Sequence, residues 1–544
     1  MKKNERNNSL VVQAGILAGA GILVRIIGLL YNTPLVHIIG DEGFGYYDSA
    51  YVAYSIVLLI SSYSIPSAVS KIIAQKLAQK EYKNAFRIFK CTLIYVAIVG
   101  LFAALFLFFG AGLLVSMESA VLPLKILAPT VFFSGILGAF RGFFQAQRTM
   151  VQTSISQIIE QIFNAGFSIW MAYILVNAAE GLGTSKRASY GAAGSTIGTG
   201  VGVLSALAFM LFVYFLNRKK FMAKIENDPT PKVDSYKSIF RLILAVVTPF
   251  IISTGIYNLN GFLDKTLYQI MQMDFHLLQE SDVAFELSAF AKANKISNIP
   301  IAIAAAMAST LIPRLSSKIA LGQIKETKDE IAKATKVTMF VAIPATVGLA
   351  VLAKPIMMVI FNQPESLDMA SLLMIILSAT VVFYGLSTMT QAVLQATGHM
   401  NIPIVNALVA LILHSVIMVL FIRILPKEAA IYVYGFSTIL YSVILCILNG
   451  ISVKRRLGYN QEFDKTFLRP LISAVIMGGL VFGVYHGIYA IMEANLLALI
   501  IAMILGVILY FVLCIKWQAL DEEEIRSLPK GATLVKISKK VKLL

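Results

Sequence analysis

The sequence predicts an all-α protein that crosses a membrane about fourteen times, and three observations lead to this fold class. Of the 544 residues, 58% are hydrophobic and only 14% are charged, whereas charged residues make up about 25% of an ordinary soluble domain. Apolar segments of about 20 residues, the length that a helix needs to cross a bilayer, recur along almost the whole chain. Most of the 46 Lys and Arg residues lie in every second gap between these segments.

Each predicted span is a mostly apolar run bounded by polar residues, glycine or proline. The spans are 11–36, 46–66, 91–115, 124–145, 151–177, 190–216, 239–272, 284–312, 337–361, 369–395, 402–425, 429–452, 468–491 and 494–516. The first run follows MKKNERNNSL and looks like a signal peptide, but it continues beyond about 20 residues with no small-residue cleavage site. It is therefore expected to remain as the first helix.

The distribution of basic residues predicts the orientation of these spans. Lys and Arg are concentrated in one alternate set of gaps and tails, at 2–6, 71–90, 148, 218–241, 314–336, 454–469 and 516–542. The opposite gaps hold only Lys186, Arg187 and Lys427. By the positive-inside rule, the crowded side is cytoplasmic, and both termini are expected there. The net charge of +17 then reflects topology, and no nucleic-acid partner is expected.

The two halves of the chain share short motifs in the same order and at a nearly constant offset. Ile65-Pro66 recurs as Ile312-Pro313, Gln145-Ala146 as Gln395-Ala396, and Tyr190-Gly191 as Tyr434-Gly435. Each copy would hold six spans, and an even number gives two parallel copies. The predicted organisation is an N-lobe at 1–216, a cytoplasmic linker at 217–238, a C-lobe at 239–452, two added helices at 453–516 and a cytoplasmic tail at 517–544.

Two parallel six-helix lobes are typical of an alternating-access transporter, with a substrate cavity at mid-membrane depth. A channel is less favoured because no repeated selectivity filter is present. An enzyme is not expected, since the sequence contains no H-E-x-x-H, Walker A or G-x-S-x-G motif. Cys91, Cys446 and Cys514 lie in apolar spans without C-x-x-C spacing, so neither a metal site nor a cofactor is expected.

Ionisable residues inside predicted spans are the first candidates for a functional site, because a charge within a bilayer costs free energy. Arg25 lies mid-way along the first span, and Lys265 and Lys295 lie in the seventh and eighth. These three cations are predicted to face one cavity and to bind an anionic group there. Asp264 and Glu160 would balance this charge or carry a coupling ion, Na⁺ or H⁺.

Each of these residues also has a purely structural interpretation. Asp264 and Lys265 could form a local pair, and Glu160 could lie near the cytoplasmic end of its span. Lys292 and Lys354 could extend their ammonium groups to the membrane surface. Arg25 is the hardest to explain in this way, because no carboxylate lies near it in the sequence.

Three stretches of the sequence resemble one family of membrane transporters. They are VRIIGLLYNTPLVHIIG in the first span, DEGFGYYDSAY after it, and ANKISNIPIAIAAAMASTLIPRLSSK in the eighth span. With the fourteen spans and the six-plus-six repeat, they resemble the MurJ-type lipid II flippases and their polysaccharide-export and sporulation relatives. These proteins belong to the MATE-like (MOP) exporter superfamily, and the resemblance covers essentially the whole chain.

The resemblance implies a cationic central cavity for a diphosphate sugar head group, and a groove for the lipid tail along helices 13 and 14. Arg25 matches a cavity arginine of the family, and Lys295 stands where the family commonly has arginine. A second family arginine in the first helix is replaced by Tyr31, and Asp48 is the nearest match to an acidic residue that follows that helix.

The expected function is therefore a flippase for lipid II, the undecaprenyl-diphosphate-linked peptidoglycan precursor, in the bacterial cytoplasmic membrane. The expected partners are this substrate, membrane lipids and proteins of cell-wall synthesis. Two alternatives stay open: a flippase for another undecaprenyl-linked polysaccharide precursor, and a MATE-type cation-coupled drug antiporter. The absence of a carboxylate between residues 11 and 40 disfavours the antiporter.

Overall fold

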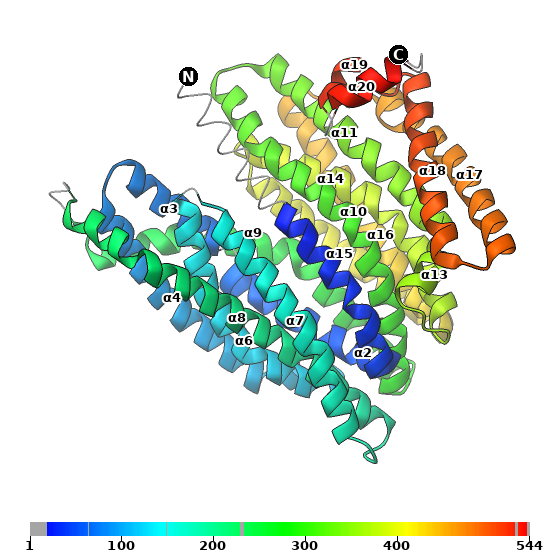
Figure 1. The fold of residues 1–544 in the computed structure, drawn as a ribbon, viewed down its shortest axis with the longest axis horizontal. Coiled ribbons are helices and arrows are strands. Elements are labelled where there is room, and N and C mark those ends of the chain that lie inside the picture. The colour runs from blue at the N-terminus through cyan, green and yellow to red at the C-terminus, as the bar shows by residue number, and fades with distance from the viewer. Residues whose placement is uncertain (1–18, 64, 148, 229–232, 528–530, 541–544) are drawn as a thin grey trace. The chain divides into compact units, whose positions relative to one another are not determined.

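The structure is a computed structural model that describes residues 19–63, 65–147, 149–228, 233–527 and 531–540. Every regular element in these ranges is a helix, as the sequence predicts. The contacts divide the chain into two compact units at Ser288, and we call residues up to Ser288 unit 1 and residues from Ala289 unit 2. Figure 1 follows both units from the blue N-terminal helices to the red C-terminal ones.

Unit 1 begins with a helix at Gly19–Leu30 and ends in the first turns of α10. Its other helices are α2 (Asn32–Leu58), η1 (Leu59–Tyr63), α3 (Ile65–Ala78), α4 (Tyr82–Phe109), α5 (Ala111–Leu114), η2 (Glu118–Ala120), α6 (Val121–Ala146), α7 (Val151–Ala178), α8 (Thr184–Glu226), α9 (Tyr236–Ile270) and η3 (Met271–Phe275). The predicted linker joins α8 to α9, and both of these helices pack within unit 1.

Unit 2 contains most of α10 (Glu280–Ala320) and the remaining helices. These are α11 (Ile324–Val351), α12 (Ala353–Ile360), α13 (Leu367–Ser378), α14 (Thr380–Ala396), α15 (Asn401–Ile424), η4 (Lys427–Ala429), α16 (Ala430–Leu457), η5 (Asp464–Leu468), α17 (Arg469–Met492), α18 (Asn495–Lys516), α19 (Glu522–Ser527) and α20 (Gly531–Lys540).

The structure confirms a polytopic membrane fold but not the count of fourteen spans. Among the described residues, ten helices are long and apolar enough to cross a membrane, or eleven if one bent pair is counted as a single span. That pair, Gly19–Leu30 with Asn32–Ser61, is bent by 44° and contains most of the first two predicted spans, of which residues 11–18 lie outside the described residues. The helices α9 and α10, which match the seventh and eighth predicted spans, are not among those counted.

Gly40 separates the first two predicted spans. Its backbone is non-helical inside α2, with φ 70° and ψ 176°. Side chains with a Cβ rarely adopt this positive φ, whereas glycine does so at little cost. The described parts of the apolar runs predicted at 11–36 and 46–66 therefore lie on either side of this glycine.

Corresponding helices have the same neighbours in both units, which agrees with the predicted repeat. In unit 1, α7 packs on α8, α6 packs on α8, and α4 packs on α6. In unit 2, α15 packs on α16, α14 packs on α16, and α11 packs on α14. The shared motifs Gln145-Ala146 and Gln395-Ala396 end α6 and α14, the two helices that occupy equivalent positions in these patterns.

Small residues allow α7 and α8 to approach closely. A Cβ added at Gly194 would lie 2.5 Å from the Met171 carbonyl oxygen, and one at Gly202 would lie 2.5 Å from that of Glu160. Between them, a Cβ at Gly198 would collide with Ser168. Glycines at four-residue spacing lie on one helix face and bring the two backbones together, as in other tightly packed membrane helices.

The tail folds onto unit 2 through a buried ion pair. Lys336 of α11 donates hydrogen bonds of 2.9 Å and 2.7 Å to the two carboxylate oxygens of Glu524 in α19. Their side chains are only 9% and 8% exposed. Ile525 and Val535 pack beside this pair in a small apolar cluster. The acidic run of the tail is thus partly internal.

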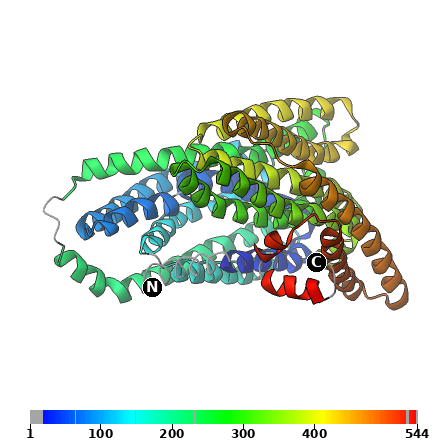
Figure 2. The same cartoon turned by 90° about the horizontal axis from the view of Figure 1, so that it is seen from above.

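Polar contacts tie the linker to the loop between α3 and α4. Lys76 lies 2.7 Å from a Glu81 oxygen and 3.0 Å from an Asp234 oxygen. Asn84 Oδ1 accepts a 2.8 Å hydrogen bond from the Asp234 amide, and Arg87 donates to the Asp234 carbonyl at 2.9 Å. We call these five residues the linker clasp. Figure 2 shows the ends of α8 and α9 on either side of blue helices of unit 1.

The linker clasp is expected to loosen in acid. The hydrogen bond from Lys76, assisted by one from Asn84, holds the pKa of Glu81 below its usual 4.5. A carboxyl whose pKa is lower in the folded protein than in the unfolded chain stabilises the fold at pH values above its pKa in the unfolded chain. This stabilisation is lost as the pH falls through the pKa of the folded protein. Hydrogen exchange at the Asp234 amide, corrected for its intrinsic pH dependence, should therefore accelerate below pH 4.5. Glu81→Gln should show fast exchange already at neutral pH, and an unchanged rate in that variant would contradict the clasp.

Candidate functional site

A polar layer in unit 1 is built on α2, whose sequence DEGFGYYDSAY combines acidic and aromatic residues. Asp48 forms an ion pair with Lys265 of α9, and the two side chains are 14% and 6% exposed. Taking two charges out of water is costly unless they are paired, so this contact fixes α9 against α2.

Neutral hydrogen bonds extend this layer on both sides of the ion pair. Gln269 of α9 donates to Ser49 Oγ at 3.0 Å, and Ser288 of α10 donates to Asp41 at 2.7 Å. Between them, a Cβ added at Gly45 would collide with the Ala284 backbone. The absence of a side chain at Gly45 therefore allows α2 and the start of α10 to lie in direct backbone contact.

A second, partly buried carboxylate lies where α9 meets α10. Glu286 accepts hydrogen bonds from the Tyr268 hydroxyl and, at 3.0 Å, from the Gln272 amide. Gln272 also contacts the His276 ring through its side-chain oxygen. These contacts form a chain of hydrogen bonds that connects Glu286 through Gln272 to His276.

On the other side of α2, Tyr31 and Tyr47 place their hydroxyls 3.1 Å apart. Both rings are buried. Tyr31, predicted to stand where the family has an arginine, is therefore an uncharged group that is hydrogen-bonded to Tyr47 and supplies no positive charge to the layer.

Glu160 is paired with an arginine that sequence reasoning did not select. Arg141 of α6 lies 2.6 Å from a Glu160 oxygen and donates a 2.9 Å hydrogen bond to Ser156. The Glu160 side chain is 31% exposed and that of Arg141 is 14% exposed. The pair joins α6 to α7. Arg141 lies within the predicted span 124–145, so its charge inside an apolar span could have identified it as a candidate from the sequence.

The structure brings together some of the predicted site residues and leaves others apart. Lys265 pairs with Asp48, while Asp264 beside it is buried. Arg25 is exposed on the helix Gly19–Leu30, and among the described residues it makes no ion pair with a carboxylate. Lys295 is half-buried on α10 in unit 2, so its predicted grouping with Arg25 stays a prediction.

The structural interpretations of Lys292 and Lys354 have different outcomes. Lys292 is 1% exposed and donates a 2.9 Å hydrogen bond to Ser366, so it does not extend to the membrane surface. Lys354 is exposed and lies 2.7 Å from Asp368, as expected for a lysine at a helix end.

Unit 2 contains an apolar cavity of about 410 Å³ between α11, α17 and α18. Its walls carry no charged side chain, and Tyr510 is its most polar residue. The residues that line this cavity are Pro300, Phe340, Val341, Pro344, Ala345, Gly348, Leu349, Leu352, Ile356, Met477, Val481, Met503, Gly506, Val507 and Tyr510. An apolar cavity of this size can hold part of a hydrocarbon chain.

The described residues contain no group of three or more His, Cys, Asp or Glu that could hold a metal ion.

Comparisons with known proteins agree on one group of membrane transporters. The family model described as "Polysaccharide biosynthesis protein" matches residues 10–319, and the model described as "MatE" matches residues 262–420. In Bacillus subtilis (strain 168), the lipid II flippase MurJ is 23% identical over 471 residues, which cover 83% of this chain and 84% of MurJ. Stage V sporulation protein B of the same organism is 24% identical over 524 residues, which cover 94% of this chain and 96% of that protein.

Solved structures share the fold at low sequence identity. The lipid II flippase MurJ in an inward closed conformation matches with a TM-score of 0.64 and 16% identity, covering 91% of this chain and 97% of that chain. An inward-facing multidrug resistance MATE family transporter matches with a TM-score of 0.60 and 14% identity, covering 80% of this chain and 98% of that chain. The MATE structure thus leaves a larger part of this chain unmatched.

Proposed function

The chain belongs to the polysaccharide biosynthesis protein family, whose model matches residues 10–319, and from this premise we propose that it is a flippase for lipid II. It is a multi-pass membrane protein of the MATE-like (MOP) superfamily, with the fold of MurJ and of MATE transporters. These relatives are flippases and transporters, in agreement with the expectation that the chain is not an enzyme.

The apolar cavity in unit 2 is the observation that carries the proposal. A drug antiporter binds a compact solute, whereas a lipid-linked sugar carries a long hydrocarbon tail that must stay in an apolar environment throughout transport. A cavity of about 410 Å³ without charged walls suits such a tail. Two of its walls are α17 and α18, the helices that the sequence adds after the two sets of six spans.

The polar layer in unit 1 supports binding of the anionic head group. Arg25 is an exposed cation on the first helix, and a guanidinium binds phosphate through two parallel hydrogen bonds. The ion pair of Lys265 with Asp48 gives a second, neutralised polar group on α2 and α9. The head group would enter from the cytoplasmic side, where both termini are proposed to lie, and leave outside by alternating access.

The proposed energy source is the membrane potential, which is worth about 2.3 kcal/mol per elementary charge at 100 mV. Coupling to Na⁺ or H⁺ is an alternative, for which Glu160 is the candidate carboxylate. In the structure this carboxylate is paired with Arg141 at 2.6 Å, so ion coupling would require this pair to open.

A second candidate is a flippase for another undecaprenyl-linked precursor. The observation in its favour is the similarity to stage V sporulation protein B, which extends over 94% of this chain. A drug antiporter is a weaker candidate, because the first helix carries Arg25 and no carboxylate between residues 11 and 40.

A rescue assay tests the proposal and separates these candidates. The resident lipid II flippase of a bacterium is depleted, this chain is expressed in its place, and growth and outer-leaflet lipid II are scored. Rescue by the wild-type chain is the expected result. Failure by a chain that is well inserted would exclude lipid II and favour another polysaccharide precursor.

Filling the apolar cavity is expected to block transport without unfolding unit 2. Gly348 lines the cavity, and a Cβ added there meets no atom within 4 Å, so Gly348→Phe should be accommodated. Each methylene of the tail displaced from an apolar site costs about 0.8 kcal/mol, so displacing two of them lowers transport by more than about tenfold. Initial rates of lipid II transport in proteoliposomes measure this effect.

Gly479→Phe is the matched control for this prediction. Gly479 lies on α17, outside the cavity lining, and a Cβ added there also meets no atom within 4 Å. The control variant should keep the wild-type rate. Equal rates for both variants would show that the tail does not use this cavity.

A further inference from the structure

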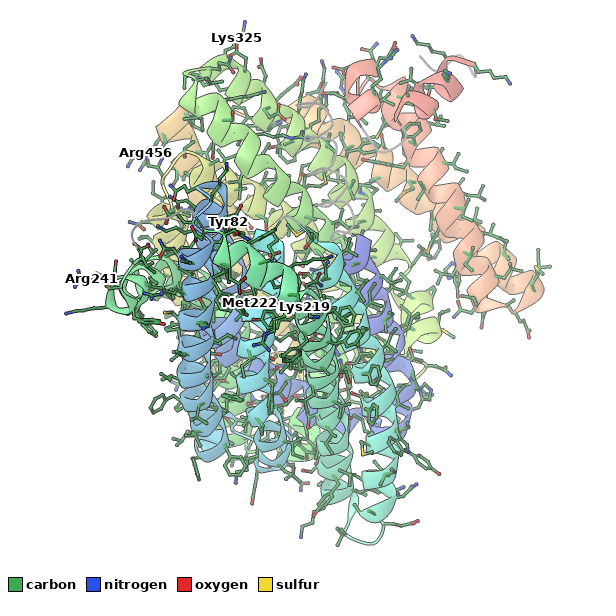
Figure 3. All side chains as sticks on the ribbon, turned by 60° about the vertical axis from the view of Figure 1, so that its left-hand side comes forward. Tyr82, Lys219, Met222, Arg241, Lys325 and Arg456 are labelled. Carbon is green, nitrogen blue, oxygen red and sulfur yellow. The ribbon has the colours of Figure 1, made fainter. Side chains whose placement is uncertain are left out.

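A second cavity lies at the end of unit 1 where basic residues gather. It has a volume of about 420 Å³ and lies among the ends of α3, α4, α6 and α8. Its lining is Ala74, Leu77, Ala78, Lys80, Tyr82, Ala85, Phe86, Phe143, Ala146, Gln147, Phe221, Lys224 and Ile225. Figure 3 shows Tyr82 at this end of the helices, beside Lys219 and Met222 of α8. We call it the basic-end pocket.

The walls of the basic-end pocket combine an aromatic floor with two cations. Phe143 of α6 and Phe221 of α8 meet edge to face, with ring centroids 5.2 Å apart. Lys80 and Lys224 are exposed, and among the described residues they are the only charged side chains in the lining. The nearest acidic residue in the loop, Glu81, is already bound by Lys76 and Asn84. The pocket therefore has a net positive charge that its own walls do not neutralise.

We propose that the basic-end pocket binds the phosphate-bearing head of an amphiphile, with its apolar part against Phe143 and Phe221. Volumes of about 300–1,000 Å³ with apolar walls and a few polar groups are typical of ligand sites. Lysine binds phosphate as a compact point charge. An anionic phospholipid is the source that this chemistry favours, because the pocket opens at the ends of membrane-spanning helices, where lipid head groups lie. A soluble organic phosphate shares the same chemistry.

The ligand would also stabilise the linker clasp. The pocket wall at Lys224 and Ile225 continues directly into the linker, and the Lys83 amide next to Tyr82 donates to Asp228 of that linker. A ligand that joins the α3–α4 loop to the end of α8 holds the same two segments that the clasp joins. By linkage, the basic-end pocket should bind the ligand more tightly when the linker clasp is closed than when it is open. This inference does not depend on the identity of the transported substrate.

The test uses the purified full chain in phosphatidylcholine nanodiscs, into which phosphatidylglycerol is titrated, with bound lipid counted by native mass spectrometry. Lys80→Gln/Lys224→Gln should weaken retention of phosphatidylglycerol about thirtyfold, since each of the two basic residues contributes about 1 kcal/mol to binding an anionic lipid. Lys219→Gln/Lys237→Gln removes the same charge outside the lining and should retain the lipid as the wild type does. Equal weakening in both double variants would overturn the site.

A variant that fills the basic-end pocket distinguishes binding inside the pocket from attraction of the lipid by charge alone. Ala78 lines the pocket and is exposed, so Ala78→Trp fills it without removing a cation or a core residue. It should weaken retention as strongly as the double lysine variant, with an unchanged melting temperature, and wild-type retention would overturn the proposal. Competition by glycerol 3-phosphate would identify a soluble phosphate as the source, and retention despite it would identify the lipid.

Discussion

Replacing Lys265 with alanine is expected to cause the largest loss of stability of any single change in unit 1. The variant leaves Asp48, whose side chain is 14% exposed, as an uncompensated charge between α2 and α9. Breaking a buried pair from one side costs about 3–5 kcal/mol, a large part of the stability of a folded domain. The melting temperature of the detergent-purified protein should fall sharply, and Asp48→Ala should lower it by a similar amount.

Two further variants make this expectation specific. Lys265→Met/Asp48→Leu removes both charges together, and it should recover most of the lost stability because no unpaired charge remains. Lys354→Ala breaks the ion pair with Asp368, whose side chains are 57% and 85% exposed. Such surface pairs are worth about 0–1 kcal/mol, so that variant should melt close to the wild type. A Lys265→Ala variant that melts like Lys354→Ala would contradict the buried pair.

Replacing Arg25 with alanine is expected to cause the largest loss of transport at normal protein levels. Arg25 is exposed and lacks an ion pair among the described residues, so its removal leaves no buried carboxylate behind. Two charge-assisted hydrogen bonds to a diphosphate are worth about 3 kcal/mol together, and losing them lowers transport roughly a hundredfold. Arg25→Lys keeps the charge but loses the planar fork, and it should be intermediate.

Arg241 provides the matched control, because it is an exposed arginine of the same unit at the start of α9, outside the polar layer. Arg241→Ala should transport at the wild-type rate. Full activity of a well-inserted Arg25→Ala variant would remove Arg25 from the site while leaving the fold assignment intact.

The fold was predictable because hydropathy reports directly on burial in a bilayer. The apolar runs of the sequence recur as helices, and the glycine at Gly40 and the bend before Asn32 explain where the first two spans meet. The count of fourteen is not confirmed, since boundaries at bent or broken helices depend on packing and not on composition alone.

The partners of charged residues were not predictable from local sequence. Lys265 was predicted to face a cavity, with a local pair to Asp264 as the structural alternative, and the structure pairs it with Asp48 on another helix. Glu160 was selected without Arg141, although the two form one ion pair. The acidic tail residue Glu524 reaches Lys336 far back in the chain. These pairs arise from tertiary packing, so the sequence identified candidate charges but not their contacts.

The most direct test of the central claim is reconstitution of the purified chain in liposomes that contain labelled lipid II in one leaflet. The account predicts that wild-type protein moves the label to the opposite leaflet, that Gly348→Phe slows this movement, and that Arg25→Ala nearly abolishes it. Folded wild-type protein that moves no undecaprenyl-diphosphate-linked sugar, but exports a cationic dye against an ion gradient, would contradict it.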